Sequence, residues 1–175
     1  EGLVDEAAGL RLLAGLDLEG ISRTRLAQRA GRAPVAHAIP ASPGVAVGRA
    51  AFDASTAAAR AGAGEDVILV RRDIATSDLP GLLAAQGVLT SVGSRTAHAA
   101  VVARQLGKVC LVGCRDLQLD PAGGGVLGPV RLAPGDLLSL DGASGDVYTG
   151  AVDLVVERPT ADLATARGWR RGGLQ

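Results

Sequence analysis

The amino-acid sequence predicts a domain of mixed α/β class, and three observations indicate it. Short aliphatic runs alternate along the chain with short stretches that favour helix. Apolar residues make up 47% of the 175 positions, enough for one sizeable core, and that core must be aliphatic because the chain has one Phe, one Tyr and one Trp. Near the C-terminal end, two strand-like runs flank a turn-rich Asp-Gly-Ala-Ser-Gly segment, as in an antiparallel hairpin.

The expected elements are short and follow one another closely. Apolar residues recur at three- and four-residue steps over the first thirty-odd positions, and Ser22 caps a second helical stretch that runs to Ala30, so the chain should open with helix. Prolines at 34, 40 and 43 end that pattern. Beyond them we expect strands at 45–52, 67–71, 87–90 and 109–112, helices at 55–61, 78–85 and 97–106, and hairpin strands at 136–140 and 146–149.

These patterns divide the chain into three parts. We expect a helical connector at 1–36, a globular domain at 37–157 and a polar linker or tail at 158–175. The tail carries Arg170-Arg171-Gly172-Gly173, whose basic character would suit nucleic acid, although a solvated linker is the simpler interpretation. Because the chain begins with Glu and contains no Met, we also expect it to be a fragment, a processed form or a piece made for expression, and not a complete translated product.

Charge and hydropathy argue against several classes of partner. Eighteen basic and eighteen acidic side chains leave no net charge to attract nucleic acid or an anionic membrane. No apolar run approaches the length of a membrane span, and the N-terminal residues lack the order of a signal peptide. We therefore expect neither a nucleic acid nor a membrane as partner, and a cytoplasmic location.

Several reactive residues have simple structural interpretations. Cys110 and Cys114 have no distant cysteine to pair with and no further metal ligands nearby, so two reduced thiols are expected, at least one of them packed as a small apolar group. His37 lies between prolines and is interpreted as an ordinary linker residue. Gly123-Gly124-Gly125 lacks the Lys and the preceding strand of a nucleotide loop, and is expected to be a flexible surface loop. No metal site is expected.

The segment around His98 is the most informative part of the sequence. Thr96 is a good N-cap, the residues to Leu106 favour helix, and Gly107 is typical of a helix end. His98 therefore falls in the first helical turn, where free backbone N–H groups and the helix dipole favour an anion such as a phosphoryl group on the ring. The alternative from the residues alone is a partly buried histidine that only packs.

A series of segments around His98 forms one recognisable pattern: Ile39–Gly48, Val67–Arg71, Asp78–Ala85, Gly87–Thr90, Arg95–Arg104, Gly107–Cys114 and Gly135–Tyr148. Together they resemble the central phosphohistidine domain of the pyruvate, phosphate dikinase family, the mobile domain of PEP-utilising enzymes. The likeness covers about residues 34–150. The resemblance implies a swivelling β/β/α domain preceded by a short helical connector.

The resemblance also implies roles for individual residues. His98 would be the phosphorylated residue, Thr96 would place a hydroxyl near the phosphate, and Arg104 would be a charge partner further along the helix. Arg95 would either touch the phosphate or face water. No cofactor is expected on this chain itself, whereas Mg²⁺ and ATP are implied at partner domains.

Three positions depart from the family pattern. Ser94 stands where the family has a second Gly, and Ala97 stands where it has a hydroxyl residue before the histidine. Ile74 replaces a Thr that family members place close to the histidine. Each loss removes a hydrogen-bonding group from the expected phosphate environment, which leaves open a slowed or degenerate carrier.

The function implied is phosphotransfer. His98 would carry phosphate between an ATP/phosphate site and a pyruvate/phosphoenolpyruvate site, on an ATP-binding domain and a barrel domain in the same or another chain. As a single domain the chain is not expected to be active alone. Two alternatives stay open: a phosphohistidine domain of a phosphoenolpyruvate synthase or sugar phosphotransferase first enzyme, and a non-catalytic interaction module.

Overall fold

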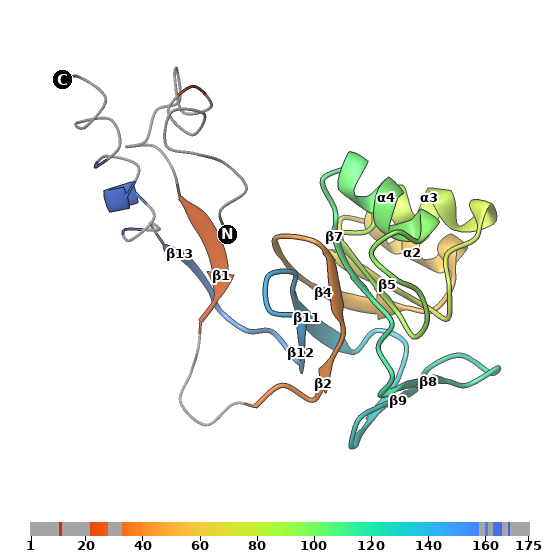
Figure 1. Cartoon of the computed structure of the whole chain (residues 1–175). Helices are drawn as coiled ribbons and strands as arrows, with labels where there is room; N and C mark the ends of the chain where they lie inside the picture. Colours follow the sequence, from red (N-terminus) through yellow and green to blue (C-terminus); the bar gives the residue numbers. More distant parts are fainter. Residues whose placement is uncertain are drawn as a thin grey trace. The chain divides into compact units, whose positions relative to one another are not determined.

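The computed structural model describes residues 11, 22–27, 33–157, 160, 163–165 and 168 (Figure 1). Residues Arg25–Val155 form one compact unit, and Glu1–Thr24 together with Val156–Gln175 form a second. Most of the described residues belong to the first unit. Most of the predicted tail at 158–175 and most of the predicted helical connector lie outside the described residues.

One eight-stranded mixed sheet organises the larger unit. Its four central strands, β4 to β7, run parallel, because each pairs in parallel with the next, while the outer strands are antiparallel. The strand order across the sheet is β2-β12-β11-β4-β5-β6-β7-β3. The bounds are β2 Ala36–His37, β3 Ile39–Ser42, β4 Val45–Ala51, β5 Val67–Arg71, β6 Gly87–Thr90, β7 Val109–Val112, β11 Leu137–Asp141 and β12 Asp146–Thr149.

Three α-helices cover one face of this sheet (Figure 1). They are α2 Ala54–Gly62, α3 Leu79–Ala84 and α4 His98–Gln105, with a 3-10 turn, η1 Thr76–Asp78, leading into α3. Alternate strand residues such as Val67, Leu69 and Val88 pack against them, because successive side chains of a strand point to opposite faces.

A second, three-stranded sheet covers the other face. Its strands are β8 Leu117–Leu119, β9 Gly125–Leu127 and β10 Val130–Leu132, all antiparallel. Leu127 and Leu132 from this sheet pack with Ile68, Val70 and Leu89 of the large sheet. The result is three layers, β/β/α, with a parallel sheet buried on both sides. The predicted fold class is confirmed.

Most predicted elements coincide with observed ones. The strand predictions at 67–71, 87–90 and 109–112 match β5, β6 and β7 residue for residue. The predicted hairpin is β11 and β12, which pair antiparallel. Both cysteines are free and buried, as expected, and burial raises the pKa of Cys110 to about 12 and that of Cys114 to about 11.

Three local predictions were wrong. Ser22 does not start a helix: Arg23–Leu26 is the strand β1, paired with β13 Leu154–Glu157, because a strand partner more than a hundred residues away overrides local helix preference. His37 is not a linker residue but ends β2, with its Nδ1 3.2 Å from Asp146 Oδ1. The glycine run is not a free loop either, since Gly125 begins β9 and Gly124 is buried.

No helix among the described residues is long and apolar enough to cross a membrane. The same part of the chain holds no group of three or more His, Cys, Asp or Glu side chains placed to bind a metal ion.

Gly81 lets α3 approach α2 closely, and this contact can be tested. A Cβ at residue 81 would lie 2.6 Å from the Ala54 Cα, so we expect Gly81→Ala to lower the free energy of unfolding. Overpacking of this kind costs about 1–3 kcal/mol, more than the gain in helix propensity of up to about 1 kcal/mol. Chemical denaturation measures the difference. Gly62→Ala is the matched control, because nothing lies within 4 Å of the added Cβ, and an equal loss there would contradict the packing argument.

Candidate active site

His98 lies at the edge of the sheet where the parallel strands β4 to β7 end. The loop 91–97, called here the His98 loop, connects the end of β6 to α4. His98 is the first residue of α4, and its side chain is exposed. Within the described part of the chain, the imidazole has no hydrogen-bond or ion-pair partner. Loops at this edge of an α/β sheet are where ligand sites usually form.

The start of α4 differs by one residue from the prediction. Ala97, with φ −60° and ψ 150°, is the N-cap, and no side chain caps the helix. Thr96 is instead part of a turn closed by the Ala97 N–H and the Ser94 carbonyl at 3.0 Å. Its hydroxyl lies 3.0 Å from the Ser94 hydroxyl. The prediction of Thr96 as N-cap was therefore wrong, because the turn uses Thr96 before the helix begins.

The start of the His98 loop, at Val92, is held against the sheet by hydrogen bonds. The Val92 N–H donates to the Arg72 carbonyl at 3.0 Å, and the Val92 carbonyl accepts from the buried Thr90 hydroxyl at 2.7 Å and from the Gly113 N–H at 3.3 Å. Gly113 has φ +64°, and a Cβ there would lie 2.9 Å from the Gly93 carbonyl oxygen. A side chain at residue 113 would therefore push this loop away from β7.

Arg104, on α4, contacts the same loop nearer its end, at Arg95. Its Nη2 donates to the Arg95 carbonyl at 2.8 Å. The resemblance to the family implied a place at the site for Arg104 and left open whether Arg95 touches phosphate or faces water; the structure brings the two together, with contact through the Arg95 backbone. The Arg95 side chain is exposed, and within the described residues it has no hydrogen-bond or ion-pair partner.

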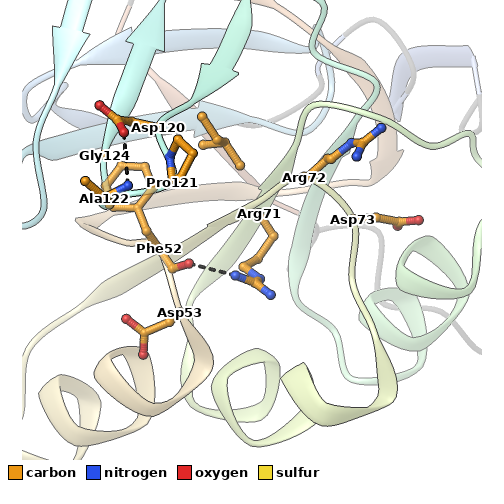
Figure 2. A pocket seen from close by; sticks show the side chains of 11 residues that line it. Phe52, Asp53, Arg71, Arg72, Asp73, Asp120, Pro121, Ala122 and Gly124 are labelled. Carbon is orange, nitrogen blue, oxygen red and sulfur yellow. Dashed lines mark hydrogen bonds between the residues drawn. The ribbon is translucent and has the colours of Figure 1, made fainter.

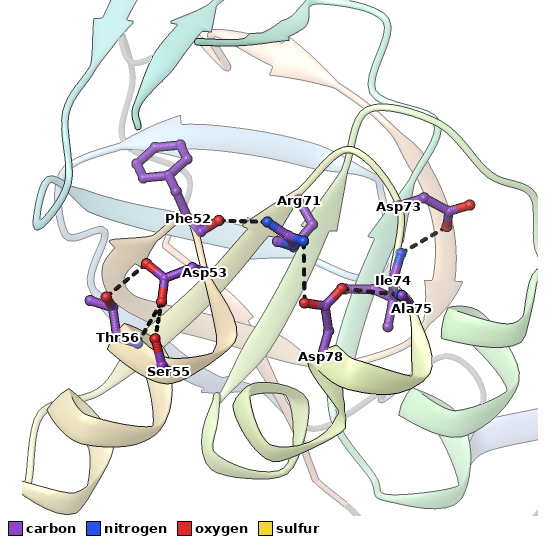
Figure 3. Close-up of polar contacts among 9 residues, drawn as sticks. All are labelled: Phe52, Asp53, Ser55, Thr56, Arg71, Asp73, Ile74, Ala75 and Asp78. Carbon is purple, nitrogen blue, oxygen red and sulfur yellow. Dashed lines mark hydrogen bonds and ion pairs between the residues drawn. The ribbon is translucent and has the colours of Figure 1, made fainter. Parts of the chain in front are cut away.

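A second polar cluster fixes the neighbouring loops at this edge (Figure 3). Arg71, the last residue of β5, donates through Nη1 to the Phe52 carbonyl at 3.0 Å and lies 3.3 Å through Nη2 from Asp78 Oδ1. Asp78 is nearly buried and also accepts from the Ala75 N–H at 3.0 Å. Sequence reasoning missed this cluster, although an Arg at the end of an apolar strand, followed by an Asp before a helix, was a signal for it.

Known proteins are similar in sequence to most of this chain. Residues 63–145 match the family described as PEP-utilising enzyme, mobile domain. Pyruvate, phosphate dikinase 1 of Arabidopsis thaliana is 36% identical over 97% of this chain, and the dikinases of Entamoeba histolytica and Clostridium symbiosum are 36% and 43% identical over 88% and 68% of it. The chain belongs to the PEP-utilising enzyme mobile domain family.

The chain covers only part of the length of these relatives. It spans 18%, 17% and 14% of the lengths of the Arabidopsis, Entamoeba and Clostridium proteins. Two solved structures, an NMR structure of Enzyme I and the N-terminal domain of Enzyme 1 - Nitrogen, align with 61% and 59% of the chain and with 38% and 36% of their own. Their TM-scores are 0.36 and 0.34, at 29% and 23% identity.

The mobile domain also has a cavity of about 530 Å³ at this edge, shown in Figure 2. It lies between the ends of β4 and β5 and the turn that joins β8 to β9. Its walls carry both signs of charge, since Arg71 and Arg72 face it together with three Asp residues. The lining residues are Phe52, Asp53, Arg71, Arg72, Asp73, Leu119, Asp120, Pro121, Ala122, Gly123 and Gly124.

Asp53 shapes one rim of that cavity as the N-cap of α2. Its carboxylate accepts from the Ser55 hydroxyl at 2.6 Å, and from the Thr56 N–H and hydroxyl at 2.7 Å each. The Ser55 hydrogen bond first, and then those from Thr56, hold the pKa of Asp53 below its usual range. The Asp53 carboxylate is thus held in place by hydrogen bonds from the first turn of α2.

Two of the three departures from the family pattern lie in the His98 loop. The Ser94 hydroxyl forms a hydrogen bond with the Thr96 hydroxyl. Ala97 is the N-cap of α4 and has no side-chain group that could cap the helix. The third, Ile74, is buried among the residues that pack beneath the helices. Its N–H donates to Asp73 Oδ1 at 2.8 Å, so the backbone at this position is satisfied while the side chain is purely apolar.

The buried hydroxyl of Thr90 should contribute measurably to stability. Thr90→Val removes the bond to the Val92 carbonyl inside a fully buried site, and we expect the free energy of unfolding to fall by about 1–3 kcal/mol. Thr76→Val, at an exposed position of η1, should stay within about 0.5 kcal/mol of wild type. Chemical denaturation of both variants decides this. Equal stability of the Thr90 variant and wild type would mean that the hydroxyl does not anchor the loop.

Proposed function

We propose that the chain is a phosphotransfer domain whose His98 carries a phosphoryl group between two sites on other domains. One site would hold ATP or phosphate and the other pyruvate or phosphoenolpyruvate, as the name of the dikinase relatives suggests. The observation that carries the proposal is the position of His98: an exposed imidazole at the first residue of a helix without a side-chain cap, directly after a loop that is hydrogen-bonded to the sheet.

The helix start offers donors for the phosphate. Within the described residues, the backbone N–H groups of His98 and Ala100 donate to no other residue, and no side chain caps the helix by a hydrogen bond. The first N–H groups of a helix, together with its dipole, stabilise an anion placed there. The exposed Arg95 guanidinium and the Thr96 hydroxyl are the side chains best placed in sequence to add to this stabilisation.

The chemistry needs little else from this chain. A neutral imidazole nitrogen attacks the phosphorus of the donor, an N–P bond forms, and the P–O bond to the leaving oxygen breaks. The reverse displacement passes the group to the acceptor. Mg²⁺ and ATP would be bound by the partner domains, where ATP would be the phosphoryl donor and Mg²⁺ would neutralise negative charge during transfer. The chain's own residues hold the imidazole and bind the phosphate between the two steps.

Phosphorylation of His98 can be tested directly. The chain is incubated with phosphoenolpyruvate, Mg²⁺ and a dikinase lacking its own mobile domain, and is then analysed by mass spectrometry under alkaline conditions. We expect an acid-labile phosphate on His98, which His98→Asn abolishes and His37→Asn leaves intact, because His37 lies in β2 with Asp146 as its partner. Phosphate on His37, or on neither histidine, would overturn the proposal.

A non-catalytic interaction module is the second candidate, and the side chains of Ile74 and Ala97 favour it. If those positions slow transfer, Ile74→Thr with Ala97→Ser should speed phosphorylation of His98 by about one to two powers of ten, roughly 1.4 kcal/mol for each tenfold. The effect on stability should be small, because a hydroxyl at the N-cap gains about 0.5–2 kcal/mol while a buried hydroxyl at residue 74 costs about 1–3 kcal/mol.

Single-turnover phosphorylation beside a thermal melt measures both effects. Ala97→Ser alone separates the contribution of the N-cap from that of residue 74. A double variant no faster than wild type would show that these hydroxyls are dispensable, and the module would lose its support.

A further inference from the structure

The outer part of the His98 loop has few attachments. Residues 93–96 are all exposed, and two of their hydrogen bonds stay within the loop, from the Ala97 N–H to the Ser94 carbonyl and between the Ser94 and Thr96 hydroxyls. Among the described residues, one hydrogen bond joins 93–96 to an element outside the loop. It is the bond from Arg104 Nη2 to the Arg95 carbonyl, at 2.8 Å.

We infer that Arg104 is a positioning residue for His98, acting through the Arg95 carbonyl and not as a ligand of the phosphate. The inference rests on the proposed function, because it concerns how the phosphate-carrying imidazole is held. The loop enters α4 only three residues after Arg95, so any displacement of the Arg95 peptide passes through Thr96 and Ala97 to His98.

The contact between Arg104 and the Arg95 carbonyl can act on His98 because of helix α4. Arg104 and His98 belong to the same eight-residue helix, so the guanidinium ties the loop to the element that carries the histidine. Ala100 and Ala103 of that helix are fully buried against the sheet, which fixes α4 while its other face stays exposed. A planar, charged guanidinium donates strongly to a neutral carbonyl and is more rigid than an ammonium group. The loop, the helix start and the imidazole are thereby held as one unit.

The competing role for Arg104 is direct contact with the phosphate. The two roles differ in timing, because the bond to the Arg95 carbonyl exists before any phosphate is present. A positioning role therefore predicts a changed loop in the unphosphorylated protein when Arg104 is replaced. A ligand role predicts an unchanged loop until His98 is phosphorylated.

The experiment compares Arg104→Met, Arg104→Lys and Arg115→Met with wild type. Arg115 is the matched control, since it is an exposed arginine that follows β7 and, within the described residues, forms no hydrogen bond or ion pair. Backbone amide NMR of the unphosphorylated chain reports on residues 95–98, and single-turnover phosphorylation with the truncated dikinase reports on the reaction. A thermal melt confirms that each variant is folded.

For Arg104→Met we expect shifted amide resonances and faster hydrogen exchange at residues 95–98 before phosphorylation. Its phosphorylation should be about ten- to a hundredfold slower, because a small misplacement of a reacting group has that effect. Arg104→Lys should recover much of both signals, since its ammonium still donates to the carbonyl. Arg115→Met should match wild type throughout. The melting temperature should hardly change, because the bond is exposed.

Two results would overturn the inference. The first is an unchanged loop in unphosphorylated Arg104→Met, whatever its rate, since a slow reaction with an intact loop assigns Arg104 to the phosphate. The second is a disturbed loop that reacts at the wild-type rate. Failure of the proposed function is distinct, because it would appear as absence of phosphate on His98 of the wild-type chain.

Discussion

The burial of β5 to β7 on both faces, beside the parallel strand β4, is the constraint on which the rest of this structure depends. Val67, Ile68, Leu69 and Val70 are all fully buried, two directed at the helices and two at the three-stranded sheet. Strands of this kind have no polar face, so their chemistry must be carried by the loops at their ends. Because the four strands are parallel, the loops that follow them meet at one edge. His98 lies there for that reason.

The sequence predicted the elements whose signal is local and missed those that need a distant partner. The strand at 67–71 is a continuous apolar run with polar residues on both sides, and its bounds could be read directly. β8, β9 and β10 are three residues each, too short for a period-two pattern to show, and the Asp and Gly residues between them suggest only loop. β1 was mistaken for helix because its pairing with β13 appears in no local window.

The candidate site divides in the same way. The helix start near His98 was predicted from composition, but the N-cap moved from Thr96 to Ala97, since which residue takes the extended conformation depends on the turn closed at Ser94. Arg71 ends β5 and Asp78 lies in the 3-10 segment after the next turn, so no shared helix or strand links them, and their pairing was missed although each residue type at its position was a signal. Arg104 was assigned to the site by resemblance, whereas its acceptor, a backbone carbonyl, carries no sequence signal.

Under the proposed function His98 would have to reach two partner sites, which sets conflicting requirements, and the structure of the His98 loop would satisfy both. Access requires an exposed imidazole, yet transfer requires that its orientation be held closely. A buried imidazole would be held in one orientation, but partner sites could not reach it. Here the loop is held through its backbone. Thr90 and Gly113 donate to the Val92 carbonyl near the start of the loop, and Arg104 donates to the Arg95 carbonyl near its end. Because these hydrogen bonds go to backbone carbonyls, they use neither the imidazole nor the N–H groups of His98 and Ala100. The fold therefore holds the loop in place while the histidine stays accessible.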